Sequence, residues 1–373
     1  MKVAVGLSGG VDSSLSAHLL KEAGHDVTGV YLECWKAPGC RAEEDRKDAL
    51  AVALELEIPF RTLDFKDAYR QRVVEIFFED YKKGLTPNPD VWCNTEIKFG
   101  LFYDWAMAQG FDAIATGHYA RVGKGIEGQP TLHMLRSADE KKDQTYFLYR
   151  TEQEQLSHIL FPIGHLTKKQ VREEAKRRNI VVAGKPDSQG ICFIGDINVH
   201  DFLKERFGEL PGDVLDMEGN VVGKHKGHWF YTVGQRHGFE LFPVVYTKHE
   251  DWKHVLPPLY VISKNAENNT IIVGFGQETV ADNVPVRDVF VRDEAVLKLA
   301  EGESVPLMVR VRHGGALLNA SFVWKDLENK RGEIRLEEAQ RGLAPGQSIV
   351  WYSAEDSQIC LGGCVISERV FTL

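Results

Sequence analysis

The chain has 373 residues and a mass of 42.0 kDa, and its 45 lysines and arginines against 54 aspartates and glutamates give a formal net charge of −9. A hydrophobic fraction of 43% excludes an intrinsically disordered protein, and the length predicts two or three domains. No run approaches the roughly 18 apolar residues of a membrane span, and the first residues predict a strand rather than a signal peptide. We therefore expect a cytoplasmic protein without membrane contact. Its acidic balance argues against sequence-independent nucleic-acid binding, although it permits a local basic patch.

The first 120 residues alternate β-branched runs with segments of helical period, which indicates an α/β fold. We expect strands over 3–7, 27–32, 61–65 and 112–116, and helices over 13–23, 42–56, 68–83 and 95–109. Strands joined by crossover helices form a parallel, doubly wound sheet, whose ligands bind beyond the carboxyl ends of the strands. The loops after Leu7, Leu32 and Thr116 are therefore the expected binding loops.

The composition changes after about residue 204, where glycine, proline and turn signals such as Pro211-Gly212 and Pro345-Gly346 become frequent. We expect a catalytic domain over 1–203, a small central β-rich domain over 204–276, and a C-terminal antiparallel β-barrel over 277–373. The barrel strands are expected over 307–312, 317–324, 332–336, 348–352 and 360–366. Before this change, residues 151–179 are expected to be helical.

A glycine-rich segment lies between the first strand and the first helix, and consists of Gly6, Leu7, Ser8, Gly9, Gly10, Val11, Asp12 and Ser13. Its glycines let the backbone approach an anion, its serine hydroxyls donate hydrogen bonds, and the following helix N-terminus adds N–H groups and a positive dipole. The alternative is a structural glycine turn. The segment has no lysine and is not a Walker A loop. It resembles instead the pyrophosphatase loop (PP-loop) of ATPases that cleave ATP to AMP and pyrophosphate, among them GMP synthetase, lysidine synthetase and several thiolases.

Six cysteines in 373 residues are too few for a disulfide scaffold, so those that matter are expected to be reactive thiols or ligands. Cys93 precedes a helix expected to begin near Asn94, and a helix N-terminus lowers the pKa of a thiol. Cys192 lies in a glycine-punctuated loop near Lys185, and we expect it to be exposed. The alternative for each cysteine is a small, buried, apolar side chain.

Six motifs follow one another along the chain: Ser8 to Ser13, Thr86 to Asp90 with Cys93-Asn94, Ala115 to Arg121, Lys142 to Leu148, Asp187 to Gly195, and Tyr231 to Arg236. This ordered set resembles the tRNA-specific 2-thiouridylases (the MnmA/TrmU family) over nearly the whole chain. The three-part architecture of that family agrees with the boundaries given above. The resemblance implies an enzyme that adenylates the C2 oxygen of the wobble uridine, in tRNAs such as those for Lys, Glu and Gln, and then replaces that oxygen with sulfur.

The resemblance also implies the roles of single residues. Cys192 would carry a persulfide supplied by a sulfur-donor protein, and Cys93 would be the partner nucleophile that closes a transient disulfide with Cys192. ATP with Mg²⁺ would be a substrate on the PP-loop, with Leu32 and Gly117 at the adenine, and neither a tightly bound prosthetic group nor a structural metal is expected. Asp90 would be a general acid/base. The target base would lie against Asn88, Pro89 and Asp90, and tRNA would contact His118, Lys142, Asp143, Gln144, Arg312, His313 and Gln347.

Some features depart from the family or leave alternatives open. Residues 240–255 are longer and more apolar than expected, and Arg312 is followed by His313-Gly314-Gly315 where the family usually has an aromatic and a second basic residue. No role follows for Cys34, Cys40, Cys360 and Cys364, whose spacing is unusual for zinc. The basic run over 168–178 is either a tRNA-docking surface or a solvated helix face. Rival functions are another PP-loop enzyme, such as an iron–sulfur thiolase or a ligase, and a non-catalytic tRNA-binding protein.

Overall fold

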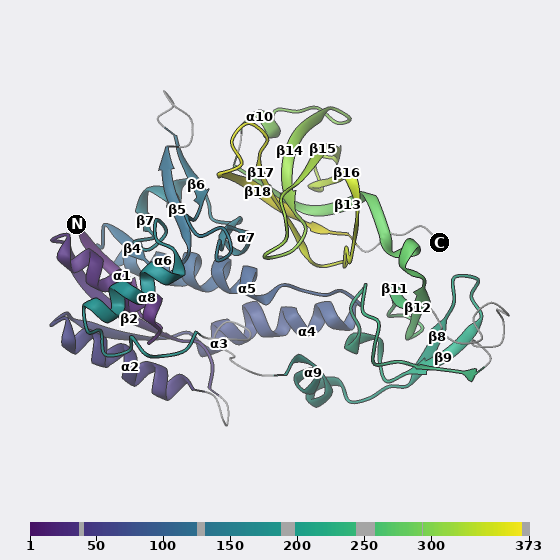
Figure 1. Cartoon of the computed structure of the whole chain (residues 1–373), viewed down its shortest axis with the longest axis horizontal. Helices are drawn as coiled ribbons and strands as arrows, with labels where there is room; N and C mark the ends of the chain where they lie inside the picture. Colours follow the sequence, from purple (N-terminus) through teal and green to yellow (C-terminus); the bar gives the residue numbers. More distant parts are fainter. Residues whose placement is uncertain (37–40, 125–130, 188–197, 244–257, 293, 368–373) are drawn as a thin grey trace.

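The computed structural model describes residues 1–36, 41–124, 131–187, 198–243, 258–292 and 294–367. Within these residues the strands form three sheets, which Figure 1 shows as a parallel sheet near the N-terminus, a small sheet at the opposite end of the molecule, and a barrel beside both. None of the helices described is both long and apolar enough to cross a membrane.

The first sheet is parallel and has the strand order β3-β2-β1-β4-β7. This confirms the doubly wound α/β architecture and adds a fifth strand inside the segment expected to be helical. The added strand, β7, has only two residues, too few to produce a recognisable alternation of polar and apolar side chains. The strands are β1 Lys2–Gly6, β2 Asp26–Glu33, β3 Phe60–Asp64, β4 Ala113–Ala115 and β7 Ile159–Leu160, and the helices around them include α1 Val11–Glu22, α2 Ala42–Glu55 and α8 Lys168–Arg177.

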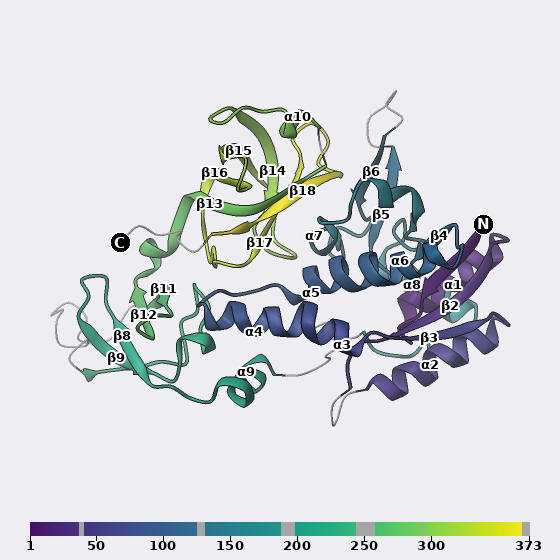
Figure 2. The same ribbon diagram turned by 180° about the vertical axis from the view of Figure 1, so that it is seen from behind.

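Two long helical runs extend from this sheet toward the other end of the molecule (Figures 1 and 2). The first comprises α3 Lys66–Tyr69, a π-helical turn Arg70–Val74 and α4 Glu75–Lys82, and the second comprises α5 Pro89–Trp92, a π-helical stretch Cys93–Leu101 and α6 Phe102–Ala108. The prediction of a helix start near Asn94 is therefore wrong. Pro89 occupies the first helical position and the Asn88 side chain accepts a hydrogen bond from the Val91 N–H at 3.4 Å, so the helix begins about five residues earlier.

The central sheet has the order β10-β9-β8-β12-β11. Its pairs are antiparallel except β8 with β12, and its small core includes Val214, Val261 and Ile271. The strands are β8 Gly212–Leu215, β9 Val221–His225, β10 Glu240–Leu241, β11 Tyr260–Asn265 and β12 Thr270–Gly274, and helix α9 Val199–Phe207 precedes them. Most of the unusual 240–255 segment lies outside the described residues.

The C-terminal sheet confirms the predicted antiparallel barrel. Its first strand also pairs with its last, which closes six strands: β13 Val280–Val291, β14 Ser304–Arg310, β15 Leu318–Asp326, β16 Arg331–Arg341, β17 Ser348–Ser353 and β18 Ile359–Ile366. Strand β13 is absent from the sequence prediction, because Pro285 and nearby acidic residues weaken its strand pattern. A hairpin from the first part of the chain, β5 Ala120–Lys124 with β6 Leu132–Arg136, pairs with β18. The divisions at 203/204 and 276/277 stay predictions.

Candidate functional site

The PP-loop leaves the carboxyl end of β1, the central strand of the parallel sheet, and turns directly into α1. Gly9 adopts a φ of +73°, and a Cβ there would lie 2.3 Å from the backbone oxygen of Asp45. The N–H of Ser8 donates to Ser13 Oγ at 3.2 Å, and the two serine hydroxyls lie 3.1 Å apart. The glycine expected in the turn is therefore required by both conformation and space.

The loop after β4 closes over the PP-loop. A Cβ on Gly117 would lie 2.6 Å from the Ser13 nitrogen, and the Tyr119 hydroxyl donates to Asp12 Oδ1 at 2.9 Å. Leu32, at the end of the neighbouring strand β2, is buried. The structure thus places the loop after β4 against the PP-loop, as the crossover topology predicts.

Two lysines from distant parts of the chain also reach this loop. Lys168 Nζ lies 2.8 and 2.9 Å from the two carboxylate oxygens of Asp12 and 2.9 Å from Asp187 Oδ1. Lys185 Nζ donates to the Gly9 carbonyl at 3.0 Å and to the carboxylates of Asp45 and Asp48. The sequence does not identify either lysine as a neighbour of the loop, because no local spacing relates them to it.

The base loop, defined as residues 86–90, is held by the barrel. The Thr86 N–H donates to the Pro345 carbonyl at 2.7 Å, and Gln347 Nε2 donates to the carbonyls of Thr86 at 2.8 Å and Pro87 at 3.2 Å. Gly346, with a φ of +92°, packs against the same loop. A cavity of about 230 Å³ opens beside it, lined by residues that include Asn88, Val91, Trp92, Tyr149, Gly346 and Ser348.

Cys93 lies in the second turn of the helix that begins at the base loop, so its predicted position at a helix N-terminus is wrong, and its side chain is fully buried. Lys98, on the same π-helical stretch, has its Nζ 3.3 Å from His118 Nε2, and His118 Nδ1 lies 2.7 Å from the Thr116 hydroxyl. Burial, together with the Lys98 ammonium, lowers the pKa of His118 well below its usual value, so this imidazole is neutral and accepts from the ammonium.

The remaining cysteines divide in two. Cys192 and Cys40 lie outside the described residues, so the pairing of Cys93 with Cys192 stays a prediction. Cys34, Cys360 and Cys364 are buried, and burial raises the pKa of the Cys360 and Cys364 thiols, which keeps them protonated and poorly nucleophilic. Among the described residues, no three His, Cys, Asp or Glu side chains gather as a metal site would require.

Comparisons with known proteins cover almost the entire chain. A tRNA methyl transferase HUP domain matches residues 1–196, a tRNA methyl transferase PRC-barrel domain matches 200–275, and an aminomethyltransferase beta-barrel domain matches 289–366. Relatives called tRNA-specific 2-thiouridylase MnmA from Streptococcus thermophilus and Staphylococcus epidermidis are 40% and 38% identical, over 98% and 99% of this chain and 95% of their own. The chain belongs to the tRNA-specific 2-thiouridylase family.

Solved structures resemble this 2-thiouridylase family member more distantly. The U34-tRNA thiolase NcsA from Methanococcus maripaludis, solved with its [4Fe-4S] cluster, is 18% identical, with a TM-score of 0.36 over 56% of this chain and 66% of its own. A 4-thiouridine synthetase in complex with RNA and ATP is 16% identical, with a TM-score of 0.35 over 55% of this chain and 50% of its own. The family assignment rests on the full-length relatives, which also make the chain a sulfurtransferase-class enzyme.

The residues that the family resemblance implies as tRNA contacts differ in their accessibility. Lys142, Arg312 and His313 are exposed, and the His313 ring lies 4.4 Å from the Phe147 ring. His118 and Asp143 are buried, whereas Gln144 and Gln347 are half-buried and hydrogen-bonded within the protein. All seven contacts stay predictions.

Asp143 has a structural role that the sequence did not suggest. Its carboxylate is 1% exposed and accepts hydrogen bonds from Arg310 at 2.5 Å, the Thr145 hydroxyl at 2.8 Å and the Ser137 N–H at 3.1 Å. Arg310 belongs to barrel strand β14, so this buried ion pair joins the barrel to the first part of the chain. Arg136 also lies 3.8 Å from the Asp143 carboxylate, so removing Arg310 would leave that buried charge with a single, more distant arginine.

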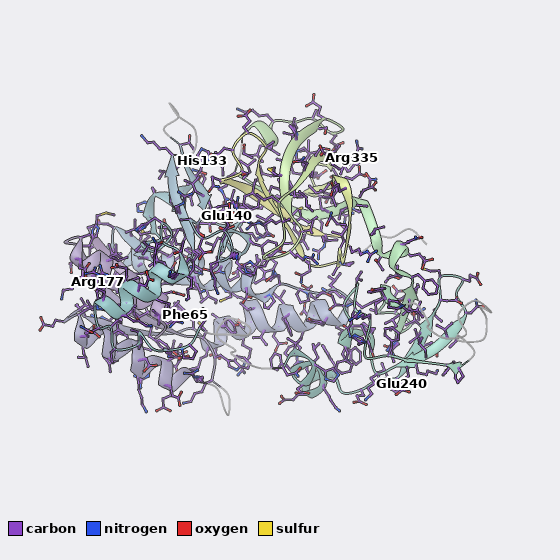
Figure 3. The ribbon with its side chains drawn as sticks, in the orientation of Figure 1. Phe65, His133, Glu140, Arg177, Glu240 and Arg335 are labelled. Atoms are coloured by element: carbon purple, nitrogen blue, oxygen red, sulfur yellow. The ribbon has the colours of Figure 1, made fainter. Side chains whose placement is uncertain are left out.

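The basic run over 168–178 is not a uniform surface. Lys168 faces the PP-loop, Arg172 bonds the Asp187 carboxylate, and Arg178 pairs with Glu22 at 2.7 Å. Only Lys169, Lys176 and Arg177 of these basic side chains are exposed. Figure 3 shows Arg177 near one end of the molecule and Arg335 on the barrel, so the exposed part of this run is separate from that face of the barrel.

Proposed function

We propose that this chain forms 2-thiouridine at the wobble position of tRNA, through adenylation by ATP followed by sulfur transfer from a persulfide on Cys192. One observation carries the proposal: a single short loop, 116–119, touches both halves of the candidate site. Gly117 and Tyr119 contact the PP-loop, and His118 contacts Lys98 on the helix that carries Cys93. A nucleotide on the PP-loop and a base beside Cys93 would therefore meet at this loop.

In the first step, the C2 oxygen of uridine attacks the α-phosphorus of ATP. A new bond joins this oxygen to phosphorus, the bond to the bridging oxygen breaks, and pyrophosphate leaves with its electron pair. The N3 proton of the uracil is lost in the same activation, and we assign Asp90, in the first turn of α5, as the base that takes it. Adenylation converts a poor leaving oxygen into AMP.

In the second step, the terminal sulfur of the Cys192 persulfide attacks C2, and AMP leaves with the electron pair of the C2–O bond. The Cys93 thiolate then attacks the Cys192 sulfur, which breaks the persulfide S–S bond and leaves the outer sulfur on the base. The released base anion takes back a proton at N3, so the products are 2-thiouridine and a Cys93–Cys192 disulfide. A thiol reductant must reopen that disulfide, and a persulfide-donor protein must reload Cys192.

ATP enters this scheme as a substrate together with Mg²⁺. The Asp12 carboxylate, whose two oxygens pair with Lys168 in this structure, would supply the kind of oxygen ligand that Mg²⁺ prefers, and the hydroxyls of Ser8 and Ser13 lie in the same loop. Because the proposed substrate is tRNA, we place the reaction in the cytoplasm.

The test is mass spectrometry of tRNA nucleosides after incubation with ATP and a persulfide donor. Cys192→Ser should abolish 2-thiouridine while ATP-dependent activation of tRNA remains measurable, because the persulfide acts after adenylation. Cys93→Ser should also stop turnover, yet leave Cys192 able to accept labelled sulfur on a non-reducing gel. Cys364→Ala is the matched control, since that buried thiol lies in the barrel core and should be dispensable for sulfur transfer.

Three results would contradict the proposal. Retained thiolation in Cys192→Ser would remove this cysteine from the mechanism. A visible absorption band of an iron–sulfur cluster in the active enzyme would favour the cluster-dependent rival, and tRNA binding without ATP cleavage would favour the non-catalytic one.

A further inference from the structure

Lys168 is built into the edge of the PP-loop. Its Nζ lies 2.8 and 2.9 Å from the two oxygens of Asp12, which is 156 positions earlier in the chain, and its side chain is only 16% exposed. The helix start that carries it is fixed by a capping box between Thr167 and Gln170 and by the Lys168 N–H, which donates to Asp139 Oδ2 at 2.8 Å. This lysine therefore supplies the loop with the cation that its own sequence lacks.

Lys168 belongs to a network of charged side chains beside the loop. Its ammonium forms ion pairs with both Asp12 and Asp187. The Asp187 carboxylate also pairs with the Arg172 guanidinium and lies 3.5 Å from Lys142 Nζ. Together with Asp139, whose carboxylate accepts from the Lys168 N–H, three carboxylates face three cations, so the network is close to neutral and Lys168 is the cation of this network that bonds the PP-loop. Partial burial alone would raise the pKa of Asp187, but hydrogen bonds from Lys168 and Arg172 outweigh it and lower the pKa to about 2.

Lys185 provides a contrast on the other side of the loop. Its ammonium is surrounded by the Gly9 carbonyl and the carboxylates of Asp45 and Asp48, so acidic groups outnumber it. An excess of negative charge would repel a phosphate. Lys185 therefore holds the loop backbone in place, whereas around Lys168 the cations match the carboxylates in number.

We propose that Lys168 contacts the β- and γ-phosphates of ATP and is a further residue of the nucleotide site. The inference rests on the proposed function, because it requires ATP on the PP-loop. Apolar side chains would hold α1 against α8 equally well, because a buried ion pair is often no more stabilising than an apolar contact. Stability alone therefore does not explain why a mostly buried ammonium lies between Asp12 and Asp187. During adenylation the leaving pyrophosphate takes the electron pair of the broken P–O bond, and a fixed ammonium beside it stabilises that charge without reorganising.

Lys168→Met tests this inference, because methionine keeps much of the apolar stem and removes the charge. We expect ATP to bind about tenfold or more weakly to Lys168→Met, while AMP, which lacks the β- and γ-phosphates, changes by less than about threefold. Lys169→Met is the matched control, since its neighbouring side chain is 86% exposed and should leave both affinities unchanged. Affinities are measured by calorimetry, with the fold checked by thermal unfolding.

A second measurement uses the unaltered protein and so does not depend on the variant folding. ATP, but not AMP, should slow the acetylation of Lys168 relative to Lys169, as read by peptide mass spectrometry. Equal weakening of ATP and AMP, unchanged ATP binding, or the absence of protection by ATP would each overturn the inference. If the unaltered protein binds no ATP, the proposed function fails instead, so the two failures are distinguishable.

Discussion

The PP-loop and the base loop are held by different parts of the molecule. The PP-loop is contacted by the 116–119 loop, Lys168 and Lys185, which all belong to the region around the parallel sheet. The base loop is contacted by Pro345, Gly346 and Gln347 of the barrel, with Gln347 lying 261 positions after Thr86 in the chain. Loosening the barrel should therefore impair placement of the target base while leaving ATP binding intact.

Among the variants considered, Gly346→Ala should have the largest effect on the base loop while sparing the PP-loop. The new Cβ would lie 2.9 Å from the Thr86 nitrogen and 3.0 Å from the Thr86 oxygen, so the base loop must move. We expect thiolation per unit of tRNA to fall by more than about tenfold, because small displacements from reactive geometry are costly. ATP affinity, measured separately by calorimetry, should not change.

Gly342→Ala is the matched control for backbone strain. Gly342 also has a positive φ, +71°, but an added Cβ there meets nothing within 4 Å among the residues that the structure describes. It should carry the conformational cost of about 1–2 kcal/mol without displacing the base loop. Equal loss of thiolation in both variants would attribute the effect to strain and contradict the role of the barrel contact.

Reversal of the exposed part of the basic run tests whether tRNA also docks near the parallel sheet. The triple variant Lys169→Glu, Lys176→Glu and Arg177→Glu should weaken tRNA binding about tenfold, or 1.4 kcal/mol. It should also flatten the dependence of log affinity on log salt concentration, by about one unit for each phosphate that the protein no longer neutralises. Arg172 is left intact here, because it bonds Asp187 inside the protein.

The control for this triple variant reverses three exposed basic side chains outside α8. Lys47, Arg61 and Arg70 are exposed and lie on α2, β3 and the first π-helical turn. Their joint reversal to glutamate should leave the salt slope as it is. An unchanged slope in the α8 variant would assign this helix face to solvent and move the docking surface to the barrel or to Lys142.

Gln347→Ala should have a smaller effect than Gly346→Ala. It removes two hydrogen bonds to the carbonyls of Thr86 and Pro87, each worth about 1 kcal/mol, without forcing the loop to move. We expect the KM for tRNA to rise by a few-fold at nearly constant kcat, and Gln277→Ala, an exposed glutamine before β13, to change neither. A fall in kcat with unchanged KM would show that Gln347 acts in the chemical step.

The contrast between the PP-loop and the base loop also explains which parts of the site can be predicted from the sequence. The PP-loop follows from local order alone, because a buried strand, two glycines and a helix start are adjacent in the chain. The predicted start of the Cys93 helix is wrong, although Asn88 and Pro89 carry the signal of a cap followed by proline. The contacts of Lys168 and Gln347 join residues 156 and 261 positions apart, and no spacing in one sequence reports them.

The smallest expected effect on thiolation concerns Lys264 of β11, which ties the central sheet to the segment before the base loop. Its Nζ donates to the Tyr231 carbonyl at 2.8 Å and lies 3.4 Å from the Leu85 carbonyl. Burial lowers the pKa of Lys264 to about 7, because desolvation disfavours the charged ammonium. The unfolded chain, with the ordinary value of 10.5, therefore binds one more proton than the folded protein between these two pH values.

It follows that the free energy of unfolding contributed by Lys264 rises with pH from about 7 upward, by at most about 1.4 kcal/mol per pH unit. Below pH 7 both states hold the proton and the slope disappears. His228 nearby does not interfere, since burial lowers its pKa below the usual 6.5 and it titrates on the acidic side. Thermal unfolding between about pH 6 and 9 should show this rise in the unaltered protein and in Lys226→Met, an exposed control, but not in Lys264→Met. Parallel curves for Lys264→Met and the unaltered protein would mean that the ammonium stays charged in the fold, and that the central sheet holds the base-loop segment through a cation.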